Sequence, residues 1–171
     1  MNLQALKNEL KQKIVRPFYI FTGDEWQGQL IYINQISKVK ELSVNRLDSI
    51  SKVYMKLKSG SFISNSSIYV VRDDVEFIQN EKLQENVKGS LGNNVYILLL
   101  TSVDKRTKFY KKYKDDIVEF EYFDDKVLIK YIQKEIDLSP ANCKKLIDVC
   151  ESDYGRILLE IDKIKRYCDA G

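Results

Sequence analysis

The stretch Val95-Tyr96-Ile97-Leu98-Leu99-Leu100 is the longest apolar run in this chain of 171 residues, and it decides the fold class. Every side chain in it is aliphatic or aromatic, so both faces of an extended strand here would be apolar and are expected to be buried. Strands of this kind are typical of a sheet that is covered by helices on both faces. The run is far shorter than the roughly 20 residues that a membrane-spanning helix needs, so we expect no membrane partner.

Shorter strand-like stretches lie on either side of this run. They are Phe18–Phe21, Val44–Leu47, Ile68–Val71 and Ile117–Phe120. Stretches with apolar residues at helical spacing separate them, including residues 75–89 with a break near Asn80. Strands that alternate with helices are joined by right-handed crossovers, which makes the sheet mainly parallel. The sequence therefore predicts an α/β fold with a parallel sheet of about five strands and flanking helices.

The sequence also predicts where several helices of this α/β part begin and end. The first helix should end at Pro17, because the residue before a proline avoids the helical region. Asp24 should cap the second helix, and Asp104 should cap a basic helix that runs through Lys114. The apolar positions of the first helix are Leu3, Leu6 and Leu10, and those of the second are Trp26, Leu30, Ile33 and Ile36.

The alternation stops after Tyr122, and three helical periods follow. The second of them starts at Ser139-Pro140, a capping residue followed by a proline at the first helical position. This change predicts two closely packed domains, residues 1–123 and residues 124–171. The apolar faces of the three helices carry Val127, Leu128, Tyr131 and Ile132; Cys143, Leu146, Ile147 and Cys150; and Ile157, Ile161, Ile164 and Cys168.

The composition excludes several classes of site. The chain has no histidine, which excludes catalytic triads and metal sites that need an imidazole. Its three cysteines are widely spaced, so we expect buried thiols rather than a zinc site. The net charge of +3 excludes a histone-like basic protein. The first residues are charged and amphipathic, unlike a signal peptide, so we expect a cytoplasmic protein.

The turn after the first strand, Thr22–Gln29, lacks what a phosphate-binding loop needs. It contains two glycines, but Gln29-Leu30 stands where such a loop has Lys followed by Ser or Thr. Asp24 and Glu25 would also repel phosphate. The third strand ends in an acidic pair, Asp73-Asp74. In an intact NTPase an acidic pair at this position can hold Mg²⁺, but here we expect a strand end and a helix cap. The sequence therefore predicts no cofactor, no metal and no catalytic residue.

Six basic residues, the last of them Lys114, follow the fourth strand and alternate with aromatic ones. Basic residues interleaved with Phe109, Tyr110 and Tyr113 can follow a DNA backbone. The alternative is a solvated face over a packed aromatic edge. The candidate DNA contacts, here called the basic segment, are Lys105, Arg106, Lys108, Lys111 and Lys112.

Four stretches, in this order, resemble the delta subunit family of the bacterial DNA polymerase III clamp loader. Phe18–Gly23 with Asp24-Glu25 resembles that family's opening strand, glycine and acidic residue, at the position of a lost phosphate loop. Ser59–Val71 resembles the segment in which a helix ends, an aromatic residue is presented and a central strand begins. The other two stretches are Val103–Lys108, like the family's Asp-Lys-Arg stretch, and Asp153–Tyr167, like its last lid helix.

The resemblance implies a RecA/AAA+-like fold followed by a small three-helix lid domain, without ATP hydrolysis. It implies a subunit that binds a sliding clamp, opens it and allows its loading on primed DNA during replication. Its partners would be the sliding clamp, other clamp-loader subunits and, weakly, primed DNA. The holoenzyme is a DNA-directed DNA polymerase, a nucleotidyltransferase. The family's third domain, a helical collar, is expected to be absent from this chain.

The resemblance also places the clamp contact, at Ser61, Phe62 and Ile63. Phe62 stands where the family has its aromatic wedge, while Ser61 departs from the family's apolar residue and Ile63 can supply the second apolar group. The alternative for Phe62 is a place in the core. The alternative for the whole chain is a nucleic-acid-binding adaptor with a degenerate NTPase fold.

Overall fold

The computed structural model describes residues 1–52, 54 and 66–169. These residues form two compact units. The first comprises Met1–Gly23 and Ile31–Phe120, and the second comprises Asp24–Leu30 and Glu121–Gly171. The two domains predicted from the sequence, 1–123 and 124–171, stay a prediction. None of the described helices is long and apolar enough to cross a membrane.

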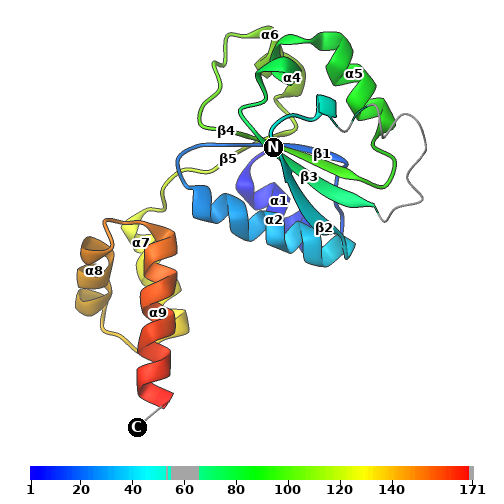
Figure 1. Ribbon diagram of the computed structural model, residues 1–171. Helices are drawn as coiled ribbons and strands as arrows, with labels where there is room; N and C mark the ends of the chain where they lie inside the picture. The colour runs from blue at the N-terminus through cyan, green and yellow to red at the C-terminus, as the bar shows by residue number, and fades with distance from the viewer. Residues whose placement is uncertain (53, 55–65, 170–171) are drawn as a thin grey trace. The chain divides into compact units, whose positions relative to one another are not determined.

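The first unit contains a sheet of five parallel strands in the order β2-β3-β4-β1-β5 (Figure 1). The predicted α/β fold is thus confirmed, and β4 has the bounds that its apolar run indicated. The strands are β1 (Phe18–Thr22), β2 (Ser43–Leu47), β3 (Ser67–Arg72), β4 (Val95–Leu100) and β5 (Ile117–Glu119).

Burial follows the position of each strand in the sheet. Every residue of β1 and β4 is buried, because these strands have neighbours on both sides and helices on both faces. Strand β2 lies at an edge and alternates between exposed and half-buried residues. The core on one face contains a cluster of aromatic rings in which Phe18 contacts Phe77, Tyr96 and Tyr113 at centroid distances of 5.5–5.7 Å.

Helices cover both faces of the sheet. Figure 1 shows α1 (Leu3–Lys11) and α2 (Trp26–Lys40) below the sheet, with α4 (Val75–Gln79), α5 (Glu81–Ser90) and α6 (Lys108–Tyr113) above it. The predicted break at Asn80 is confirmed: its side chain caps α5 by accepting the Leu83 N–H at 3.0 Å.

Helix α1 ends before Pro17, at Lys11, so the predicted end is wrong. Lys13 adopts a left-handed backbone conformation with φ 59°. Its N–H donates to the Leu10 carbonyl at 3.0 Å, and the N–H of Ile14 donates to the Glu9 carbonyl at 2.8 Å. These two bonds form a Schellman motif, which satisfies the last carbonyls of the helix without a proline.

Two other predicted helix features are also wrong. Thr107, not Asp104, caps the basic helix α6, because its hydroxyl accepts the Tyr110 N–H at 3.1 Å. Asp104 instead binds Arg106 through two of its guanidinium nitrogens. In α2, Trp26 is 47% exposed, contrary to the prediction, whereas Ile33 and Ile36 are buried as predicted and Gln29 is buried with them.

The second unit contains α7 (Asp125–Glu135), α8 (Pro140–Val149) and α9 (Tyr154–Asp169). Ser139 caps α8 as predicted, and Pro140 is its first residue. The buried cluster comprises Leu128, Ile132, Cys143, Ile147, Cys150, Ile157 and Ile161. The expected burial of Cys143 and Cys150 is confirmed, whereas Cys168 is exposed because it lies outside this cluster on the last turn of α9.

Candidate functional site

The segment predicted to contact a clamp, Ser61 to Ile63, lies outside the described residues. Its assignment therefore stays a prediction. The strand that follows, β3, begins at Ser67, whose backbone N–H donates to the Asn94 side chain at 2.8 Å. The described candidate sites are the turn after β1, the acidic pair after β3 and the basic segment after β4.

The turn after β1 begins at a glycine whose backbone conformation and close surroundings disfavour any side chain. Gly23 has φ +111°, in the region that side chains rarely adopt. A Cβ atom there would lie 2.1 Å from the backbone oxygen of Phe120, just after β5. The glycine thus serves the close approach of two backbone segments, which is a structural role independent of phosphate.

A buried carboxylate lies immediately before α2, which begins at Trp26. Glu25, only 2% exposed, accepts the Gly28 N–H at 3.2 Å, and the backbone N–H groups of Gln27 and Tyr154 also stabilise its charge. Glu25 therefore caps α2, and the prediction that Asp24 would do so is wrong. Free N–H groups at a helix N-terminus are what a phosphate loop offers to its ligand. Here an internal carboxylate has taken that place.

We expect the protein not to bind Mg-ATP. The lysine and the Ser/Thr of a phosphate loop are replaced, and an entering phosphate would meet the Glu25 carboxylate, so charge repulsion opposes binding. Isothermal titration calorimetry with Mg-ATP should give no heat beyond dilution. Binding at micromolar concentration would contradict this interpretation of the turn.

Glu25 should also make stability depend on pH. Burial raises the pKa of its carboxyl above the ordinary value, and the nearby Asp153 carboxylate raises it further. The backbone N–H groups lower this pKa, but by less than burial and Asp153 together raise it. Because this pKa is raised in the folded state, the contribution of Glu25 to stability is greatest below the ordinary carboxyl pKa and falls as the pH rises from the ordinary pKa through the raised one. The variant Glu25→Gln should lose less unfolding free energy than wild type over that rise in pH.

Urea titrations at a series of pH values measure this difference. Glu41→Gln, which changes an exposed carboxylate, provides the matched control. Parallel pH profiles for wild type and Glu25→Gln would show that ionisation of Glu25 carries no cost in the folded protein.

The acidic pair after β3 is used within the fold. Asp74 is buried and caps α4, with its carboxylate accepting the Phe77 N–H at 3.1 Å and the Ile50 N–H at 2.8 Å. Tyr96 donates to the same carboxylate at 3.4 Å. The predicted cap is thus confirmed. Among the residues that the structure describes, no group of three or more possible ligands gathers at a metal position.

Three members of the basic segment have acidic partners. Lys105 pairs with Glu119 at 2.8 Å, Arg106 with Asp104 at 2.9 Å and Lys112 with Glu85 at 3.6 Å. Within the described part of the chain, Lys108 and Lys111 form no ion pair. A cation that already has a carboxylate partner gains less from a phosphate. The DNA contact predicted for this segment stays a prediction, and its members without an ion pair in the described part of the chain are Lys108 and Lys111.

The aromatic residues of the segment mostly face inward. Phe109 and Tyr113 are buried in the core, and the Tyr113 hydroxyl donates to Gln84 at 3.2 Å. They are therefore not available to stack on bases. This arrangement fits a solvated face over a packed aromatic edge, which was the alternative interpretation of the sequence.

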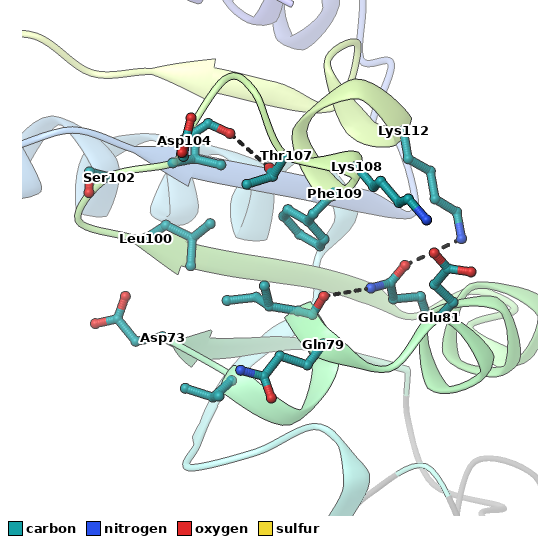
Figure 2. Close-up of a pocket in the computed structure, with 14 residues that line it drawn as sticks. Asp73, Gln79, Glu81, Leu100, Ser102, Asp104, Thr107, Lys108, Phe109 and Lys112 are labelled. Carbon is teal, nitrogen blue, oxygen red and sulfur yellow. Dashed lines mark hydrogen bonds between the residues drawn. The ribbon is translucent and has the colours of Figure 1, made fainter.

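A pocket of about 540 Å³ lies beside this segment, at the carboxyl ends of β3 and β4. Figure 2 shows Lys108 and Lys112 at one end of it, and Asp73 with Asp104 at the other. The buried amide of Gln84 donates to the carbonyl oxygens of Phe77 and Ile78 and accepts from Lys112 at 3.3 Å. No sequence pattern indicated this pocket, because its lining comes from the ends of β3 and β4, from the segment between β4 and α6, and from three helices.

No family model matches this chain, and no curated protein matches it in sequence. Among solved structures, the Bacillus subtilis DNA clamp loader delta protein YqeN is similar, with a TM-score of 0.65 and 16% identity. The match covers 96% of this chain and 57% of that one, so the chain spans less than two thirds of its neighbour. At the level of the fold, the resemblance found in the sequence is therefore confirmed.

Proposed function

We propose that this chain is a clamp-loader delta subunit, or the N-terminal part of one, which binds and opens a sliding clamp. The observation that carries the proposal is the fold shared with a clamp loader delta protein over 96% of the chain. The four sequence stretches that resemble the delta subunit family, in the same order, also support the proposal.

The turn after β1 supports a subunit that does not hydrolyse ATP. An ATPase-type fold whose phosphate position holds the Glu25 carboxylate retains its shape without the reaction. Such a subunit can act by binding alone. A ligand that binds the open clamp better than the closed clamp shifts the ring toward the open state by that difference in affinity.

The proposed partners follow from this role. They are the sliding clamp, the other clamp-loader subunits of the DNA polymerase III holoenzyme and primed DNA, all met in the cytoplasm. The clamp would receive the apolar pair Phe62 and Ile63, with Ser61 beside them. Burying one such side chain is worth about 2–3 kcal/mol, which is sufficient for a small hot spot.

A pull-down from the source cell, probed with an antibody against the sliding clamp, tests this function. Recovery of the clamp by wild type, and its loss with Phe62→Ala, is the expected result. A pull-down without the clamp that instead yields nucleic acid would favour the adaptor with a degenerate NTPase fold.

A further inference from the structure

An open groove runs between α1 and α2, on the face of the sheet opposite to the basic segment (Figure 1). It has a volume of about 400 Å³, and all of its lining residues belong to the first unit. Leu10 and Val39 form an apolar floor. The remaining lining residues are Lys7, Lys11, Gln35 and Lys38.

The groove is positively charged without compensation from its lining. Among the described residues, Lys7, Lys11 and Lys38 form no ion pair, and no carboxylate lines the groove. The C-terminal turns of α1 and α2 meet here, and each helix end carries about half a negative charge. Three lysines exceed these two helix ends by roughly two positive charges.

The hydrogen-bonding character of the lining indicates the kind of partner. Three ammonium groups donate and cannot accept, and only the amide of Gln35 can do both. A peptide offers a backbone donor at nearly every residue, and these donors would find few side-chain acceptors here. The backbone of DNA offers acceptors only. Lys7 and Lys11 are one turn apart, about 6 Å along the helix axis, so both can face the same strand.

We propose that the groove between α1 and α2 binds the sugar-phosphate backbone of DNA. The site is distinct from the basic segment, in which three of five cations already have acidic partners. The inference stands on the lining of the groove and does not depend on the proposed clamp contact. It assigns DNA binding to the α1–α2 side of the sheet.

Fluorescence anisotropy with a labelled primed-template DNA tests the proposal on the full chain. The triple variant Lys7→Gln/Lys11→Gln/Lys38→Gln should bind roughly tenfold or more weakly at low salt. Each lost contact should also reduce the slope of log affinity against log salt by about 0.7–0.9, or by about 2–3 for all three. The matched control Lys126→Gln/Lys130→Gln/Lys145→Gln removes the same charge from exposed positions in the second unit and should leave both quantities near wild type.

A second variant and a competition experiment distinguish this groove from the basic segment, and DNA from an acidic protein. The double variant Lys108→Gln/Lys111→Gln should bind almost as wild type does, and poly-L-glutamate should compete less well than unlabelled DNA of equal charge. Absence of DNA binding by wild type at low salt, equal losses in the groove and control variants, or a loss confined to Lys108→Gln/Lys111→Gln would each overturn the proposal. Stronger competition by poly-L-glutamate would identify an acidic protein as the partner instead. Clamp binding, measured separately on the same variants, should not change.

Discussion

Replacing Phe62 by alanine is expected to weaken binding to the sliding clamp by about 2 kcal/mol or more, roughly thirtyfold. In the sequence, Phe62 follows Gly60, a residue type that commonly ends helices, and precedes the polar stretch Ser64–Ser67. Neither a helical nor a strand pattern includes it, so we expect its ring to be exposed in the free protein. Exposed apolar residues of this kind mark partner sites on many proteins. Surface plasmon resonance against the purified clamp measures the effect.

Thermal melts of the same variant separate binding from folding. The melting temperature of Phe62→Ala should stay close to that of wild type, because little apolar area is lost from the core. The control Tyr167→Ala removes another aromatic side chain, which is 82% exposed on α9, and should leave clamp affinity unchanged. A Phe62→Ala protein with unaltered affinity would exclude Phe62 from the site, and a melting temperature lowered by many degrees would place it in the core.

Replacing Gly23 by alanine is expected to cost about 3 kcal/mol or more of unfolding free energy. The new Cβ atom would lie 2.1 Å from the Phe120 backbone oxygen, and φ +111° is unfavourable for any side chain. The atoms that the new Cβ would meet belong to the backbone of Phe120 and not to a flexible side chain. The turn after β1 and the segment after β5 would therefore have to move apart. Urea denaturation followed by circular dichroism measures the change.

Two other glycines provide a graded control. Gly92 has φ +55° but open space around it, so Gly92→Ala should cost only about 1–2 kcal/mol. Gly89 lies within α5, where an added Cβ atom would meet only open space, and Gly89→Ala should stabilise the protein by about 0.5–1 kcal/mol. Similar losses for Gly23→Ala and Gly92→Ala would show that the contact with Phe120 is not the cause.

The strands could be predicted because their signal is local. The run Val95–Leu100 is apolar throughout, and burial on both faces is a consequence that requires no knowledge of distant residues. Helix ends were less predictable, since short-range hydrogen bonds compete there. Thr107 displaced Asp104 as a cap, and Lys13 ended α1 without help from Pro17.

The candidate sites depended on contacts between distant parts of the sequence. Glu25 was predicted only as an acidic residue that repels phosphate, but its charge is also stabilised by the N–H of Tyr154. The groove between α1 and α2 joins lysines that are far apart in the chain and no motif links them. Single-sequence patterns describe one element at a time, so they do not contain such pairings.

The most direct test of the central claim is the affinity of the purified chain for the purified sliding clamp of the same cell. Surface plasmon resonance with the clamp immobilised should show saturable binding that Phe62→Ala weakens roughly thirtyfold. The same binding should be unaffected by Mg-ATP, since we expect the protein not to bind this nucleotide. A well-folded chain that shows no binding to the clamp, with or without Mg-ATP, would contradict the account.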